Sequence, residues 1–261
     1  MLPLPLASNR PAAHAWDLAR PAALFCLALL LVALLPTVAS AGRTGCRLRN
    51  MVSISGQFCI DKYESIVQVK QGKSWKSHSP FEPVAGLEIR AISRPAVYPQ
   101  AYISRNEAES ACKASGKRLC TEAEWEKACK GPRVTQWPYG KAHVAGACND
   151  AGVSPLNHYY GERGGVPETA YGWGPMNDPR LNQLRGSLAR TGQFRRCHNA
   201  YGVYDMVGNL HEWVATADGT FRGGYYLDTH INGDGCDYKT VAHNAVYHDY
   251  STGFRCCADP R

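Results

Sequence analysis

The sequence lacks the cysteine spacings of several common metal and redox sites. None of its 11 cysteines stands in a C-x2-C pair, and no C-x2-C-H occurs. Zinc ribbons and c-type haem attachment depend on those spacings. Both kinds of site are therefore excluded, and the cysteines need another explanation.

The sequence also lacks a basic stripe interleaved with aromatic residues. Lys and Arg together number 29 against 22 Asp and Glu, but the basic residues are scattered in short clusters such as Arg195-Arg196. Nucleic-acid-binding surfaces concentrate positive charge on one face or along one helix. We therefore expect no nucleic acid partner, and the mild positive charge is typical of an exported surface.

No unbroken apolar run reaches the roughly 20 residues of a membrane-spanning helix. The longest, Ala22–Leu35, follows Arg10 and Arg20 and precedes Ala39-Ser40-Ala41. This order of charged region, apolar run and small residues predicts a secretory signal peptide at residues 1–41. We expect a secreted, periplasmic or cell-envelope protein with no stable membrane span after cleavage. The alternative is a chain anchored in the membrane by an uncleaved signal.

Cleavage would remove Cys26 and leave an even number of cysteines in residues 42–261. An even count in an exported chain predicts disulfides, whereas in a reducing cytosol it would suggest metal binding or catalysis. The ten remaining cysteines are Cys46, Cys59, Cys112, Cys120, Cys129, Cys148, Cys197, Cys236, Cys256 and Cys257. Two of them, Cys148 and Cys197, lie near the ends of a loop-rich region, residues 131–200, and a bridge between them is the simplest way to fix it.

Local patterns predict an α+β domain built from short elements. Residues 51–65 alternate apolar and polar positions around a glycine, which predicts a hairpin, while residues 66–103 are turn-rich and predict loops and short strands. Two capping boxes, which begin at Ser104 and Thr121, predict helices that end at glycines. Short strands are expected near 201–207, 210–215, 221–226 and 253–257.

Four motifs in order make the sequence more specific. They are GKRLCTEAEWEKAC (116–129), GVYDMVGNLHEW (202–213), RGGYY (222–226) and GFRC (253–256). Together they resemble the signatures of the formylglycine-generating enzyme family, also called the sulfatase-modifying factor domain. The resemblance covers most of residues 46–261. It implies a single domain with a variant C-type-lectin-like fold, which has little regular secondary structure and often binds calcium.

The resemblance also implies an activity that this chain is not equipped to perform. Family enzymes oxidise a cysteine in a C-x-P-x-R sequence of sulfatases to formylglycine, using two thiolates that bind copper(I), a soft-ligand choice suited to that ion. Those cysteines lie between the RGG strand and the next bridging cysteine. Here that interval, residues 225–235, reads YYLDTHINGDG and contains no cysteine. We therefore expect no copper site, and no catalytic residue is assigned.

Matching the family motifs implies two disulfides, Cys112–Cys256 and Cys129–Cys236. Both would close loops of more than 100 residues and would each stabilise the fold by roughly 3–5 kcal/mol on the chain-entropy model. Cys120 and Cys257 are additional to the family pattern and are expected to pair with each other. Cys46–Cys59 and Cys148–Cys197 complete the expected set.

The same motifs imply calcium ligands in VGNLHEW. The candidates are the carbonyl of Val207, the side-chain oxygen of Asn209 and the carboxylate of Glu212, because calcium prefers oxygen donors. The alternative is a capped turn in which the two side chains satisfy backbone amides. A second interpretation concerns Asp228, His230, His243 and His248, since histidines near a cysteine suit catalysis or metal binding. A disulfide at Cys236 would exclude a nucleophile there.

Three kinds of function remain open. The first is a modifying enzyme, such as an active formylglycine-generating oxidoreductase acting on protein cysteine. The second is a secreted binding module whose loops at 131–200 recognise a protein, peptide or glycan. The third is a structural component of the cell envelope. The sequence favours a binding or altered modifying module over a copper-dependent oxidase.

Overall fold

The computed structural model describes residues 45–260, so the expected signal peptide at residues 1–41 lies outside the described part of the chain. The fold begins with the expected hairpin, in which β1 (Met51–Ile54) pairs antiparallel with β2 (Phe58–Asp61). Ser55 and Gly56 at its tip both have positive φ, 53° and 70°. Two such residues in succession match the twist of a tight hairpin turn.

Three small sheets contain all the strands in the described residues. The first has the order β1-β2-β11-β6 and the second β10-β7-β8-β9, where β10 and β7 run parallel. The third is an antiparallel sheet of order β4-β3-β5. The remaining strands are β3 (Ser65–Gln71), β4 (Ser74–Ser77), β5 (Ile89–Ser93), β6 (Arg118–Leu119), β7 (His211–Trp213), β8 (Phe221–Arg222), β9 (Lys239–Thr240), β10 (Thr252–Phe254) and β11 (Cys256–Ala258).

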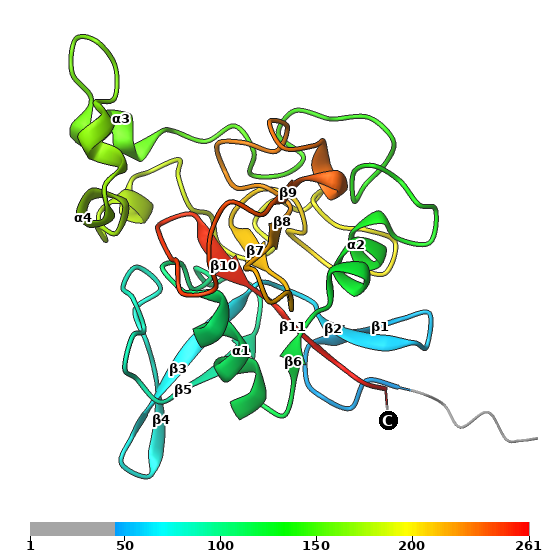
Figure 1. The fold of residues 1–261 in the computed structure, drawn as a ribbon. Helices are drawn as coiled ribbons and strands as arrows, with labels where there is room; N and C mark the ends of the chain where they lie inside the picture. Colours follow the sequence, from blue (N-terminus) through cyan, green and yellow to red (C-terminus); the bar gives the residue numbers. More distant parts are fainter. Residues whose placement is uncertain (1–44, 261) are drawn as a thin grey trace, which may run out of the picture. The chain divides into compact units, whose positions relative to one another are not determined.

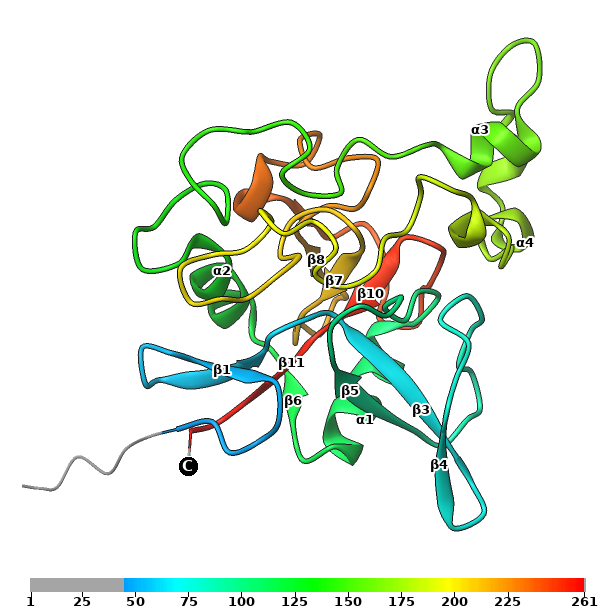
Figure 2. The same ribbon diagram turned by 180° about the vertical axis from the view of Figure 1, so that it is seen from behind.

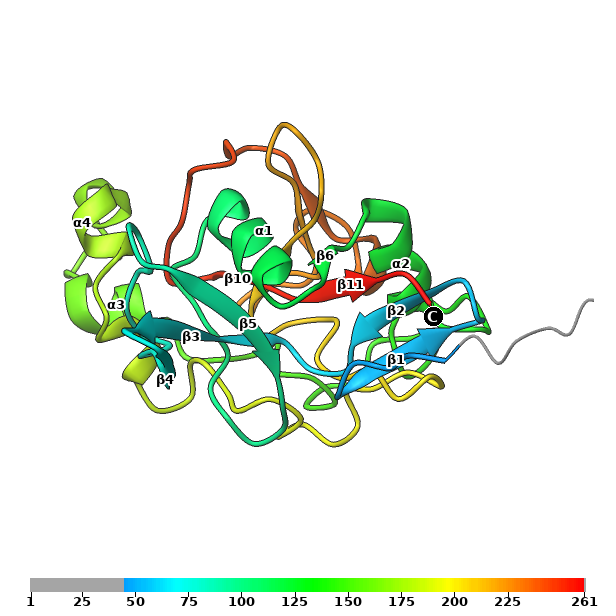
Figure 3. The same ribbon diagram turned by 90° about the horizontal axis from the view of Figure 1, so that it is seen from below.

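The two principal helices start where the capping boxes predict. Helix α1 (Arg105–Ala114) is capped by Ser104 and helix α2 (Glu122–Lys130) by Thr121, and both reciprocal bonds form in each box. Helix α1 packs against β5, as the view from below shows (Figure 3). Each helix buries the apolar stripe that the sequence predicts, so local sequence decides both their position and their orientation.

Of two further segments, one agrees with expectation and one differs. Residues 66–103 form loops and short strands as expected, and they contain most of the three-stranded sheet of β3, β4 and β5. Residues 201–207 form no strand, and only Tyr204 makes an isolated bridge, to His198.

Long loops form one side of the domain (Figures 1 and 2). Between residues 131 and 200 the only regular elements are short helices, and the sheet of β3–β5 lies on the opposite side. These helices are α3 (Pro155–Tyr160), η1 (Glu168–Tyr171), α4 (Trp173–Met176) and η2 (Leu181–Gln183); a further turn, η3 (Gly235–Asp237), follows β8. No helix of the described residues is long and apolar enough to cross a bilayer.

Five disulfides connect these elements. They join the same five pairs expected from the sequence, namely Cys46–Cys59, Cys112–Cys256, Cys120–Cys257, Cys129–Cys236 and Cys148–Cys197. Three of them close loops of 144, 137 and 107 residues. The C-terminal strand β11 is thereby fixed to α1 and to the segment before α2.

Candidate functional site

The three expected calcium ligands lie at the centre of the domain, in and just before β7. Val207, Asn209 and Glu212 are all buried, and Asn209 adopts a positive φ of 61°. All three residues lie in one short segment of the chain, which turns at Asn209. The question is whether their oxygens are free to bind a cation.

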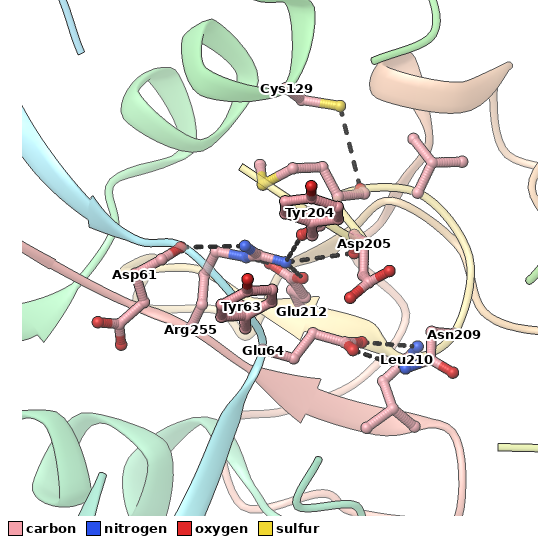
Figure 4. Close-up of polar contacts among 12 residues, drawn as sticks. Asp61, Tyr63, Glu64, Cys129, Tyr204, Asp205, Asn209, Leu210, Glu212 and Arg255 are labelled. Carbon is pink, nitrogen blue, oxygen red and sulfur yellow. Dashed lines mark hydrogen bonds and ion pairs between the residues drawn. The ribbon is translucent and has the colours of Figure 1, made fainter. Parts of the chain in front are cut away.

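The Glu212 carboxylate is already paired with the guanidinium of Arg255 (Figure 4). Arg255, between β10 and β11, donates from Nε to Oε2 at 2.6 Å and from Nη2 to Oε1 at 2.5 Å. The indole Nε1 of Trp125 also donates to Oε2, at 2.6 Å. Both ions are almost fully buried, with side-chain exposures of 0% and 1%. A two-pronged buried pair of this kind satisfies the carboxylate without a metal.

The Asn209 side chain is likewise fully used. Its Nδ2 donates to Glu64 Oε2 at 2.6 Å, while its Oδ1 accepts from Asn149 Nδ2 and from the Ala189 amide, both at 2.9 Å. The Leu210 amide donates to the other Glu64 oxygen at 3.2 Å. These bonds connect four separate segments of the chain, so Asn209 holds these segments together. The three expected residues do not fit calcium as they stand, because Arg255 holds the carboxylate.

Charges around Arg255 are unbalanced. Glu64, Asp205 and Glu212 are three buried carboxylates beside a single guanidinium, which also donates to the backbone carbonyls of Asp61, Tyr204 and Asp205. Burial raises the pKa of Asp205 to about 7, and burial together with the neighbouring carboxylates raises the pKa of Glu64 well above its ordinary value. The cluster therefore favours carrying a proton near neutral pH.

A surface pocket lies directly over this buried cluster. Tyr63 and Tyr204 stack with ring centroids 5.3 Å apart and line a cavity of about 610 Å³ together with Arg190 and Arg195. None of the described residues that line it is acidic. Asp205 anchors the floor from below, because its Oδ2 accepts from the Gly192 amide at 2.6 Å.

The close packing in this pocket depends on a glycine. Gly192 has a positive φ of 69°, and a Cβ at that position would lie 3.0 Å from the Tyr63 ring. The Nζ of Lys62 lies 5.7 Å from the centroid of the Tyr63 ring and 5.6 Å from that of Tyr204, which adds a positive charge to the aromatic pair. No local pattern in the sequence indicates this pocket, because its walls come from separate segments at residues 63, 95–96, 190–195 and 204.

Residues 225–235, the interval in which the family's copper-binding thiolates would lie, contain a turn closed by Asp228. Asp228 Oδ1 accepts from the amides of His230 and Ile231, and its Oδ2 accepts from the Tyr238 hydroxyl. Cys236, at the end of this interval, is bonded to Cys129. All ten cysteines of residues 45–260 are in disulfides, so this part of the chain presents no thiol.

The histidines noted in the C-terminal segment do not converge. His243 stacks between Phe221 and Tyr247, while His248 bonds Asn177 and packs on Trp173, and His230 lies in the Asp228 turn. These are three separate environments. A joint catalytic role for the histidines is therefore not supported by their positions.

The sequence interpretation missed His211, the first residue of β7. It is 5% exposed, its ring packs against Phe221, Tyr225 and Tyr238, and its Nδ1 has no hydrogen-bond partner. Burial lowers the pKa of His211 to about 3, so the ring is neutral at physiological pH. Only its place between Leu210 and Glu212 in the motif pointed to burial.

Comparison with known proteins now identifies the family. A family model, the sulfatase-modifying factor enzyme 1-like domain, matches residues 46–259. The chain belongs to this family. Membership confirms the expected fold class, an α+β domain of the formylglycine-generating enzyme type with a variant C-type-lectin-like fold, little helix and five disulfides.

Individual relatives cover parts of this sulfatase-modifying factor domain. Over 131 residues it is 31% identical to the formylglycine-generating enzyme of Bos taurus, a match that covers 50% of this chain and 30% of the relative. Over 155 residues it is 32% identical to a Bos taurus protein named inactive C-alpha-formylglycine-generating enzyme 2, covering 51% and 40%. The chain thus spans less than half the length of these relatives.

Among solved structures, the domain is similar to PvdO from Pseudomonas aeruginosa. The two have a TM-score of 0.47 and 16% sequence identity, and the match covers 80% of this chain and 82% of that one.

Proposed function

We propose that this chain is an exported member of the sulfatase-modifying factor family that binds a ligand and does not perform copper-dependent oxidation of protein cysteine. One observation carries the proposal: every cysteine in residues 45–260 is committed to a disulfide. Copper(I) chemistry of the family's kind needs thiolates. Similarity to a relative named as inactive is compatible with this proposal.

Export is part of the same proposal. Five disulfides in one domain suit an oxidising compartment and would not persist in a reducing cytosol. The signal expected at residues 1–41 would direct the chain there. Fractionation of cells that produce the full chain, with the N-terminus of the product sequenced, tests this directly. Cleavage near residue 42 supports export, and an uncleaved product in the cytosol contradicts it.

The pocket formed by Tyr63 and Tyr204 is the binding surface that the geometry supports best. Its arginines and nearby Lys62 are positive, its stacked rings offer apolar edges, and part of its wall belongs to the loop region at 131–200. Aromatic rings and arginines dominate the energy of many binding surfaces. The chemistry favours a ligand that carries negative charge, such as an acidic glycan or an acidic peptide segment.

Binding and oxidation are separated by two assays on the same preparation. The first incubates the protein with a C-x-P-x-R peptide, copper(I) and oxygen, and measures the peptide mass; we expect no formylglycine. The second measures binding of acidic and neutral oligosaccharides and peptides to the protein and to Arg190→Gln and Arg195→Gln.

We expect each arginine substitution to weaken an acidic ligand by roughly tenfold, which corresponds to the loss of about 1.4 kcal/mol. Arg163→Gln, an exposed arginine of the same loop region, is the matched control and should bind as the wild type does. Equal binding by all variants would remove this pocket from the proposal. Formation of formylglycine would instead support the alternative, an active formylglycine-generating oxidoreductase.

A further inference from the structure

Two histidines from distant loops meet at the surface, and each has a carboxylate partner. His143 Nε2 lies 2.8 Å from Asp150 Oδ2, and His230 Nδ1 lies 2.7 Å from Asp234 Oδ1. The two imidazole rings touch edge to face, with centroids 5.1 Å apart and an interplanar angle of 81°. The side chains of His143 and His230 are 36% and 49% exposed, so both rings are open to solvent.

Each carboxylate fixes which ring nitrogen carries the proton. A neutral His143 donates from Nε2 to Asp150 and so has a lone pair on Nδ1, while a neutral His230 donates from Nδ1 to Asp234 and has a lone pair on Nε2. A histidine that donates its second ring N–H to a carboxylate is the usual arrangement of a metal ligand. Each ring therefore keeps one nitrogen that is not bonded to its carboxylate and can bind a metal.

The spacing of the rings also suits a shared ion. Two imidazoles that bind one zinc ion at about 2.0–2.1 Å have ring centres roughly 5 Å apart. The observed 5.1 Å matches this separation. The rings are therefore close enough to share a ligand.

The loops that carry the two histidines are held together by the indole of Trp137. Its ring centroid lies 4.8 Å from that of His143 and 5.2 Å from that of His230. The second loop approaches it closely at Gly235, where a Cβ would lie 2.9 Å from the Trp137 ring. The Cys236 amide donates to the Gln136 carbonyl at 2.8 Å. Because the scaffold is already ordered, binding would cost little conformational entropy.

Asp150 supplies an independent sign that a cation belongs here. Its side chain is only 1% exposed, and its Oδ1 is buried without a hydrogen-bond partner. A buried carboxylate is costly unless a positive group compensates it. A metal-bound imidazole at His143 provides that charge, because the ion withdraws electrons from the ring that donates to Asp150.

We propose that His143 and His230 bind a divalent transition metal of the kind that imidazole prefers, with Zn²⁺ as the simplest case. No group of three or more His, Cys, Asp or Glu within residues 45–260 is arranged to hold a metal. The site therefore has two protein ligands and completes its coordination with water or a bound ligand. It is separate from the Tyr63–Tyr204 pocket, and it stands whether or not that pocket binds anything.

Calorimetric titration of the tag-free full chain with Zn²⁺ tests the site. We expect one equivalent to bind, and His143→Gln or His230→Gln to weaken binding by roughly tenfold or more. Asp150→Asn, which keeps the shape but removes the charge, should weaken binding in the same direction. His158→Gln, an exposed histidine on α3, is the matched control and should bind as the wild type does.

Unfolding temperatures of the variants without metal show whether each one is folded. Electron paramagnetic resonance of the wild type loaded with Cu²⁺ gives a measurement that needs no variant, and two imidazole nitrogens in the spectrum are expected. The absence of Zn²⁺ binding to the wild type, binding by either histidine variant as tight as that of the wild type, or a Cu²⁺ spectrum without two imidazole nitrogens would each overturn the proposal.

Discussion

Acidic side chains outnumber basic ones among the buried residues at the centre of the domain. Glu64, Asp205 and Glu212 surround Arg255, and all four side chains are buried. The cluster is stabilised by dense hydrogen bonding, with Arg255 and Asn209 each bonded to several segments. Removing one partner of such a network leaves another group buried and unsatisfied, which costs several kcal/mol. These residues therefore stabilise the fold, and we assign them no catalytic role.

Asp205 gives the network a measurable dependence on pH. Burial raises the pKa of Asp205 from 3.8 to about 7, so between these values the folded state holds a proton that the unfolded state has lost. Its contribution to the free energy of unfolding therefore falls as pH rises from about 4 to 7, by at most about 1.4 kcal/mol per pH unit. Asp205→Asn removes this contribution.

We expect the stability of Asp205→Asn relative to the wild type to improve steadily between pH 4 and pH 8. Urea unfolding at several pH values measures it. A difference between the two proteins that is constant over this range would show that the carboxyl group titrates normally.

His211 contributes the opposite slope. Burial lowers the pKa of His211 to about 3. Below pH 6.5 the unfolded state therefore binds a proton that the folded state does not bind, and the free energy of unfolding falls as pH falls. His211→Phe keeps an aromatic ring among Phe221, Tyr225 and Tyr238 and removes the unpaired Nδ1. We expect it to raise the free energy of unfolding by about 1–3 kcal/mol, and by more at pH 5 than at pH 8. A loss of stability at both pH values would contradict this account.

Calcium offers a third test at this scale. Because Arg255 holds the Glu212 carboxylate, calcium at Val207, Asn209 and Glu212 would have to displace a buried guanidinium. We expect the unfolding temperature to be the same in excess calcium and in excess chelator. A clear rise with calcium that Glu212→Gln abolishes would restore the calcium assignment.

Among the elements, those decided by local sequence were predictable. Ser104 and Thr121 start their helices through contacts only three residues along the chain, and the β1–β2 hairpin closes over a short turn. The family motifs added the long-range pairs Cys112–Cys256 and Cys129–Cys236. Local pattern and motif together therefore accounted for most of the framework.

The contacts that define the centre were not predictable in the same way. Glu64 and Asn209 are separated by 145 residues, and nothing in either local sequence marks the other as its partner. The same holds for Tyr63 and Tyr204, whose segments are joined where the Tyr204 amide donates to the Lys62 carbonyl at 2.9 Å. The oxygen-bearing side chains in VGNLHEW are of the chemical type that calcium prefers. The guanidinium that binds Glu212 is that of Arg255, which lies far along the chain between β10 and β11.

Disulfides that join distant elements should matter more than the local one. On the chain-entropy model, the 144-residue loop closed by Cys112–Cys256 is worth about 5 kcal/mol and the 13-residue loop closed by Cys46–Cys59 about 3 kcal/mol. Replacing both cysteines of a pair by alanine leaves no free thiol. We expect the first double variant to lose more stability than the second in denaturant unfolding. The reverse order would show that folded-state strain or residual structure in the unfolded chain outweighs loop entropy.

The whole domain is a family scaffold in which cysteines serve as cross-links. Its long loops are ordered by disulfides and buried hydrogen bonds more than by regular secondary structure. The side chains on the outer faces of these loops are therefore not needed to hold the fold together. The Tyr63–Tyr204 pocket and the His143–His230 pair both lie partly on these loops. Chemistry on this scaffold is therefore expected at loop surfaces and not at a thiolate pair.

The state of the cysteines tests this account most directly. The purified protein should be alkylated under denaturing, non-reducing conditions, digested, and mapped by mass spectrometry. We predict five linked peptide pairs, Cys46–Cys59, Cys112–Cys256, Cys120–Cys257, Cys129–Cys236 and Cys148–Cys197, and no alkylated cysteine within residues 45–260. Two alkylated cysteines within residues 45–260 would mean that a thiol pair is available, and would contradict the central claim.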